Sequence, residues 1–183
     1  MNVVHIFHSL KFSGAEIMYT DAAKYFKEYG CNLSVIATAE ELGEFSERFE
    51  KVGYEVYHYP FLRKNNLIEK IKYLIKIIKF LKTNNIDVVH IHSNGLYFEY
   101  SLCAYIARIK SVYTFHSVFP TKKITKLYHI AKRWIAKNIF KCTFQTISDS
   151  VYNNELSTFK NKTTKIDNWY SDDRYFPAIE NEK

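Results

Sequence analysis

The fold of this chain is decided by Val3-Val4-His5-Ile6-Phe7 and by the turn that follows, Lys11-Phe12-Ser13-Gly14-Ala15-Glu16. The first run is apolar, and the second opens an amphipathic segment that reaches Tyr29. This pattern predicts a strand, a tight turn of small residues and a helix. A helix that begins there directs unpaired backbone N–H groups and the positive end of its dipole beyond the strand. The stretch therefore indicates an α/β protein that handles an anionic, phosphorylated ligand.

The turn alone does not specify a ligand. The chain contains neither G-x-G-x-x-G nor G-x-x-x-x-G-K-[ST], so the dinucleotide and P-loop motifs are both missing. A plain connection between a strand and a helix is the alternative, and the rest of the chain has to decide.

Composition places the chain among single-domain globular proteins. It has 183 residues, of which 47% are hydrophobic, with only 5 Gly and 3 Pro, so disorder is not expected. Cys31, Cys103 and Cys142 are odd in number and far apart, which indicates reduced thiols rather than a disulfide framework or a zinc site. No secretory signal is recognised, and the apolar stretch 67–81 is interrupted by charges that exclude a membrane span.

Basic residues are concentrated in two segments. The formal net charge is +7, and residues 63–82 and 120–142 carry much of it with almost no acidic residues. Such segments attract anionic membranes, nucleic acid or phosphorylated substrates.

Strands and helices are predicted to alternate throughout. The strand candidates are residues 3–7, 33–37, 55–59, 88–91, 111–115, 143–147 and 164–166, and the helix candidates are 15–29, 41–52, 67–83, 96–109, 123–140 and 149–159. This alternation predicts a Rossmann-like, doubly wound parallel sheet over residues 1–169, followed by a linker at 170–183.

In such sheets ligands bind beyond the carboxyl ends of the strands. Polar residues recur at these predicted ends: Ser13 and Gly14, then His92-Ser93-Asn94-Gly95, then His116-Ser117, and finally Ser148-Asp149. Their recurrence at one edge indicates a ligand site there.

These segments resemble, in order, motifs of the N-terminal domain of retaining GT-B-fold glycosyltransferases of family 4. The matching segments are Ser13-Gly14-Ala15-Glu16, Asp87-Val88-Val89-His90-Ile91-His92-Ser93, Thr114-Phe115-His116-Ser117, Thr146-Ile147-Ser148-Asp149-Ser150, and Lys165-Ile166-Asp167-Asn168 with Arg174-Tyr175-Phe176-Pro177. The chain departs from the family pattern at Ser13, at Ser117 and at Asp167-Asn168-Trp169.

The resemblance implies one half of a GT-B fold, with the active site in a cleft between two Rossmann-like domains. The other domain, which holds most of the nucleotide-sugar site, is absent from this chain, so the fragment is expected to be inactive alone. The implied activity is sugar transfer from a nucleotide sugar to a glycan or lipid-linked acceptor in cell-surface polysaccharide synthesis, with no further cofactor and no metal.

Residue roles follow from position and resemblance together. His116 is the expected catalytic residue, and Ser13, Gly14 and Ala15 are expected to contact the donor phosphate. The expected acceptor-side residues are His92, Ser93, Asn94 and Ser148. The turn at Ser13 and Gly14 keeps its alternative as a plain connection. His116 could instead be a core histidine, and Ser148 could be a helix cap, which is the stronger interpretation for Ser148. His90 is expected to face away from the surroundings of His92 and to be structural.

The helix predicted from Lys123 to Phe140 has one apolar face and one basic face, the latter with Lys122, Lys126, Arg133 and Lys137. It suits either an anionic membrane surface or ordinary packing on the sheet with a solvated basic face. The expected location is therefore the cytoplasm, at the inner face of the membrane if the first alternative holds. A non-catalytic binding module that pairs with a separate donor domain or a membrane partner is the second hypothesis. Nucleic-acid binding is not expected, because no recognition motif is visible.

Overall fold

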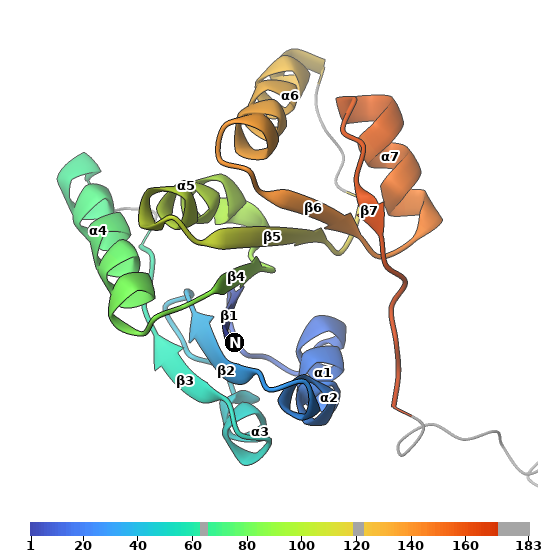
Figure 1. Cartoon of the computed structure of the whole chain (residues 1–183). Helices are drawn as coiled ribbons and strands as arrows, with labels where there is room; N and C mark the ends of the chain where they lie inside the picture. The colour runs from blue at the N-terminus through green and yellow to red at the C-terminus, as the bar shows by residue number, and fades with distance from the viewer. Residues whose placement is uncertain (63–65, 119–122, 172–183) are drawn as a thin grey trace, which may run out of the picture.

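The computed structural model describes residues 1–62, 66–118 and 123–171 (Figure 1). The strands are β1 (Asn2–Phe7), β2 (Asn32–Ala37), β3 (Glu55–His58), β4 (Val88–Ile91), β5 (Lys110–Phe115), β6 (Thr143–Thr146) and β7 (Thr164–Lys165). The helices are α1 (Gly14–Asp21), α2 (Ala23–Glu28), α3 (Ser46–Lys51), α4 (Leu67–Thr83), α5 (Tyr97–Ala107), α6 (Lys123–Asn138) and α7 (Asp149–Phe159), with a 3₁₀ turn η1 (Asn94–Leu96) before α5. The predicted linker lies outside the described residues from residue 172 onward.

The strands form one sheet in the order β3-β2-β1-β4-β5-β6-β7, and every neighbouring pair is parallel. The predicted Rossmann-like, doubly wound sheet is therefore confirmed. Because all strands run the same way, their carboxyl ends meet at a single edge. That edge carries the residues that follow β1, β4, β5 and β6.

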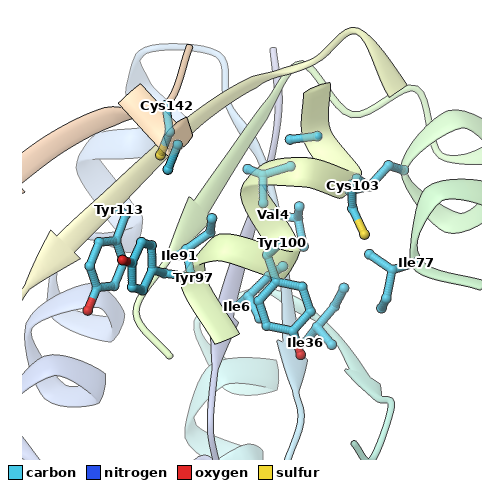
Figure 2. Packing of buried hydrophobic residues seen from close by; sticks show 14 of the residues in the cluster. Val4, Ile6, Ile36, Ile77, Ile91, Tyr97, Tyr100, Cys103, Tyr113 and Cys142 are labelled. Atoms are coloured by element: carbon cyan, nitrogen blue, oxygen red, sulfur yellow. The ribbon is translucent and has the colours of Figure 1, made fainter. Parts of the chain in front are cut away.

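Helices cover both faces of the sheet (Figure 1). On one face, Val4, Ile6 and Ile91 of the central strands pack with residues of α4 and α5 such as Ile77 and Tyr100 (Figure 2). Each of these five side chains is almost fully buried. Burial of such a side chain stabilises the fold by about 1.5–3 kcal/mol, so this layer is a main source of stability.

The other face of β1 packs against α1, α2 and α3. Val3 and Phe7 lie there with Tyr19 of α1 and Phe49 of α3. His5 lies between Val3 and Phe7 in β1 and is completely buried. A polar ring in an otherwise apolar strand needs a hydrogen-bond partner, and His92 is one.

Two predicted helices differ in extent. The segment 41–52 is helical only over Ser46–Lys51. Leu10 donates its N–H to the carbonyl of Leu42 and accepts from the N–H of Phe45, which holds residues 42–45 as a loop against the turn after β1. Gly43 lies there with φ of +103°, and a Cβ on it would meet the backbone of Leu10. The segment 15–29 is divided at Ala22 into α1 and α2.

Helix α6 presents an unexpected face to the protein. Arg133 and Ala136 are buried, whereas Ile124, Leu127 and Trp134 are 90%, 76% and 59% exposed. The assignment of Arg133 to a solvated basic face is therefore wrong, because its guanidinium pairs with the buried carboxylate of Glu155 in α7. None of the described helices combines the length and the apolar character needed to cross a bilayer.

Candidate functional site

The turn after β1 places small, exposed residues at the start of α1. Ser13 is the N-cap in extended conformation, and its hydroxyl donates to the carboxylate of Glu16 instead of capping a backbone N–H. Burial raises the pKa of Glu16, and this hydrogen bond opposes the shift. A Cβ at Gly14 would meet no atom within 4 Å. The start of α1 is therefore open at Gly14, which leaves room for an anion beside the first turn.

A chain of three histidines runs through the same edge. Nδ1 of His5 lies 3.1 Å from Nε2 of His92, and Nδ1 of His92 lies 3.0 Å from Nε2 of His116. The three residues come from β1 and from the positions directly after β4 and β5. The chain leads from the fully buried His5 to His116, which is partly exposed at the edge.

Aromatic rings enclose this chain. The ring of Phe7 stacks on His92 with centroids 4.3 Å apart, and Tyr19 of α1 lies 4.4 Å from the same ring. Burial is the main cause that lowers the pKa of His5 to about 3 and that of His116 to about 4. The pKa of His92 is also held well below its usual range, chiefly by burial. All three rings are therefore neutral near pH 7, and each has one N–H and one acceptor nitrogen.

His90 was expected to face away from the surroundings of His92, and this prediction is wrong. The two residues are two positions apart in an extended segment and share one face of the sheet, with ring centroids 4.2 Å apart. Nε2 of His90 lies 2.8 Å from the hydroxyl of Thr114, so His90 is not part of the hydrogen-bonded row of His5, His92 and His116. Ring nitrogens of His5, His90 and His92 lie within 4.8 Å of one another, a grouping that has the composition of a metal site.

The other predicted acceptor-side residues lie at the same edge in different environments. Ser93 is buried and donates its backbone N–H to the carbonyl of Ile6. Asn94 is exposed, and its side-chain oxygen accepts from the hydroxyl of Tyr113 at 2.6 Å. The hydroxyl of Ser148 accepts from the N–H of Val151, which confirms its role as the N-cap of α7.

A hollow of about 260 Å³ opens next to this edge. Its lining comes from η1, α5, the end of β5, α6 and α7, and includes Asn94, Ser117, Lys132 and Arg133. A second hollow of about 700 Å³ lies past the ends of β1 and β2, where Ser9 and Lys11 contribute to its wall. Of the predicted site residues, Asn94 therefore borders the first hollow, and Lys11, shortly before Ser13 and Gly14, borders the second.

Sequence reasoning identified His92 and His116 but missed their connection to His5. The signal was present only as a polar residue inside an apolar strand. Which strand lies beside β1 cannot be derived from the sequence of β1 itself. Arg133 and Glu155 were missed as a buried pair for the same reason, because their helices meet only in the folded chain.

Comparison with known proteins agrees with this geometry. The sequence model described as Glycosyltransferase Family 4 matches residues 12–152. The capsular polysaccharide biosynthesis glycosyltransferase CapH of Staphylococcus aureus is 27% identical over 152 residues, which are 82% of this chain. The match is only 39% of CapH, so the chain spans well under half the length of this relative.

Solved structures show the same fold. A glycosyltransferase from Rickettsia africae superposes with a TM-score of 0.68 at 20% identity, over 91% of this chain and 42% of its own. Anabaena HepE, solved with UDP and glucose, superposes with a TM-score of 0.67 at 17% identity, over 93% of this chain and 45% of its own. The chain therefore has the fold of one half of a GT-B glycosyltransferase. With most of its length matched by the family model, the chain belongs to glycosyltransferase family 4.

Proposed function

We propose that this chain is the N-terminal, acceptor-side domain of a retaining glycosyltransferase. It would help to transfer a hexose from a nucleotide sugar to a glycan or lipid-linked acceptor in cell-surface polysaccharide synthesis. The observation that carries the proposal is that the exposed start of α1 and His116 follow the carboxyl ends of β1 and β5, at one edge of the parallel sheet, with open space at Gly14. CapH, a capsular polysaccharide biosynthesis glycosyltransferase, supports the choice of pathway class.

The chemistry assigns a part to each group. Transfer breaks the bond between the anomeric carbon and the nucleotide diphosphate, so negative charge develops on the departing phosphate. N–H groups at Gly14 and Ala15 would stabilise that charge from the start of α1, and the hydroxyl of Ser13 would join them on exchanging its hydrogen bond to Glu16 for one to the phosphate. His116 would donate a hydrogen bond beside the donor sugar. Ser93, Asn94 and Ser148 would border the acceptor, whose hydroxyl must be held near the anomeric carbon.

The division into domains is part of the proposal. Residues 1–169 would form one side of the cleft and 170–183 the hinge to a donor-binding domain of the full-length protein. The reaction proposed requires no metal and no cofactor besides the nucleotide sugar. The 183-residue chain would then be inactive by itself.

The test compares the 183-residue chain with the full-length protein in a panel of nucleotide sugars, with UDP-sugars first because HepE was solved with UDP and glucose. We expect transfer with retention of anomeric configuration by the full-length protein and none by the short chain. His116→Ala should lower kcat by about a hundredfold, as removal of one preorganised donor does in other enzymes. Turnover by the short chain alone would refute the proposal that it provides only one half of the active site. A full-length protein that binds a partner without any transfer would favour a non-catalytic module.

We also propose that α6 meets an anionic membrane surface from the cytoplasmic side. Ile124, Leu127 and Trp134 project from the protein although they are large and apolar. Lys126 and Lys137 lie on the same helix and can attract acidic lipid headgroups. Such a combination is typical of helices that lie in the membrane interface.

Vesicle flotation tests this surface. The double substitution Leu127→Gln with Trp134→Gln should reduce binding to phosphatidylglycerol vesicles at least tenfold, because two apolar anchors are lost. Leu156→Gln on α7, where Leu156 is also exposed, is the matched control and should bind as the unchanged chain does. Equal binding by all three proteins, or binding to neutral vesicles alone, would exclude α6 as the anionic membrane surface.

A further inference from the structure

The three hydrogen-bonded histidines form a staircase across neighbouring strands. His5 of β1 pairs in register with His90 of β4, so His92 is two residues nearer the carboxyl edge. Ile91 pairs with Tyr113 of β5, and the same register places His116 two residues beyond the partner of His92. Each step therefore moves one ring closer to the edge, and the last ring reaches it.

Neutral rings in such a chain must all point the same way. Each ring can donate from one nitrogen and accept at the other, so the tautomer of one ring determines the tautomer of the next. Two directions are possible. Either every ring carries its hydrogen on Nδ1 and donates toward the edge, or every ring carries it on Nε2 and donates toward the core.

The buried end of the chain distinguishes the two directions. Among the described residues, Nε2 of His5 has no hydrogen-bond partner, and the atom is inaccessible to solvent. If the hydrogen bonds ran toward the core, this nitrogen would carry a buried N–H without an acceptor. In the edge-directed chain it is only an unused acceptor. Orphaned buried N–H groups are the rarer of the two, so the edge-directed chain is favoured.

We propose that His5 and His92 are positioning residues that fix His116 in its Nδ1–H tautomer, with that N–H directed at the ligand edge. His116 then acts as a neutral hydrogen-bond donor and cannot accept a proton at Nδ1. His92 acts through His116, since both of its ring nitrogens are engaged by neighbouring histidines. The assignment deepens the proposed glycosyl transfer and rests on it for its catalytic meaning, but the tautomer itself is a property of the free protein.

The direct test is NMR of the 183-residue chain with ¹⁵N-labelled histidine, in which the two ring nitrogens report protonated and unprotonated states separately. We expect His116 as Nδ1–H in the unchanged chain. His92→Phe keeps an aromatic ring beneath Phe7 but removes the link, so His116 should become a tautomer mixture. His5→Asn retains an amide at the Nδ1 position and should preserve the Nδ1–H form, whereas His5→Phe should weaken it. His90→Gln, which changes a neighbouring ring outside the chain, is the matched control and should leave the tautomer unchanged.

Some results would overturn the proposal. His116 found as Nε2–H in the unchanged chain would show the opposite direction. If His116 keeps its tautomer in both His92→Phe and His5→Phe, the hydrogen bonds from His5 and His92 do not determine that tautomer. Stoichiometric zinc in the purified protein, lost in His90→Gln, would identify a metal site instead. The measurement on the unchanged chain needs no variant to fold.

A kinetic readout separates this proposal from the proposed function. In the full-length protein, His92→Phe should lower kcat about tenfold to a hundredfold with little change in the donor KM, in line with the loss of other outer partners of a ring nitrogen. His58→Gln, at the exposed end of β3, is the control and should keep full activity. If the full-length protein transfers no sugar while NMR shows His116 as Nδ1–H, the proposed glycosyl transfer is rejected and the tautomer assignment stands. Full activity of His92→Phe would show that the hydrogen bonds among His5, His92 and His116 have no role in catalysis.

Discussion

At the scale of single residues, a substitution at Gly14 should affect ligand binding without loss of stability. Its missing Cβ would occupy open space, and its φ does not lie in the left-handed region. Gly14→Ala should therefore keep or slightly raise the free energy of unfolding, by at most about 1 kcal/mol, because alanine favours a helix. The added methyl group lies where the diphosphate is expected, so donor affinity of the full-length protein should fall. Urea unfolding and calorimetric titration with nucleotide sugar measure the two effects.

Gly30 provides the contrast for that prediction. It has φ of +72° and also has no atom within 4 Å of a built Cβ. Gly30→Ala should cost stability, by about 1 kcal/mol, because an L side chain is strained there, and donor affinity should remain unchanged. Equal donor affinity in Gly14→Ala and the unchanged protein would show that the start of α1 is only a connection.

The buried histidines predict a stability that depends on pH. The pKa of His5 is lowered from 6.5 to about 3, so below pH 6.5 the unfolded chain binds a proton that the folded chain does not. The free energy of unfolding should therefore fall as the pH drops from 6.5 toward 4, by up to about 1.4 kcal/mol per pH unit for this group. His5→Asn removes this contribution. Its unfolding free energy should change less between pH 7 and pH 5 than that of the unchanged chain, and identical pH profiles would contradict the burial of His5 as a neutral ring.

At the scale of helices and strands, local pattern predicted most elements because most are decided locally. Helix α4 begins at Leu67 as predicted, since Asn66 and Glu69 form a reciprocal capping box. The segment 41–52 was overpredicted because its first half is fixed by backbone hydrogen bonds to Leu10, more than thirty residues earlier. Periodicity within a segment contains no information about such a partner.

The contact between α6 and α7 provides a prediction at this scale. Arg133 binds the carboxylate of Glu155 through Nε at 2.7 Å and Nη2 at 2.9 Å, and Asn161 donates to the same carboxylate. Glu155→Ala leaves a buried guanidinium without its partner and should cost about 3–5 kcal/mol. Equilibrium unfolding in urea measures the loss. The exposed pair of Lys51 and Glu47 is the control, and Glu47→Ala should cost less than about 1 kcal/mol.

At the scale of the whole molecule, topology and site differ in how far the sequence predicts them. Alternating strands and helices predicted the parallel sheet, and the rule of carboxyl ends then placed Gly14 and His116 at one edge without knowledge of strand order. Prediction of the hydrogen-bonded histidines would also require the strand order and the register between strands. Their arrangement depends on β4 lying between β1 and β5 and on a register that aligns His5 with His90. These relations exist only between strands, so no pattern within one segment could reveal them.

The last described segment returns across the molecule and binds its beginning. Trp169 follows β7, yet its indole N–H donates to the carbonyl of Met18 at 3.1 Å and its ring packs edge to face with Tyr19 of α1. Trp169→Ala should cost about 1–2 kcal/mol, because a half-buried aromatic contact and one hydrogen bond are lost. It should also speed hydrogen exchange of residues 166–171, which this contact ties to α1. Trp134→Ala removes an exposed indole and should change neither quantity by more than about 0.5 kcal/mol. If both substitutions have the same small effect, the chain after β7 is not held by α1, and the hinge would begin before residue 169.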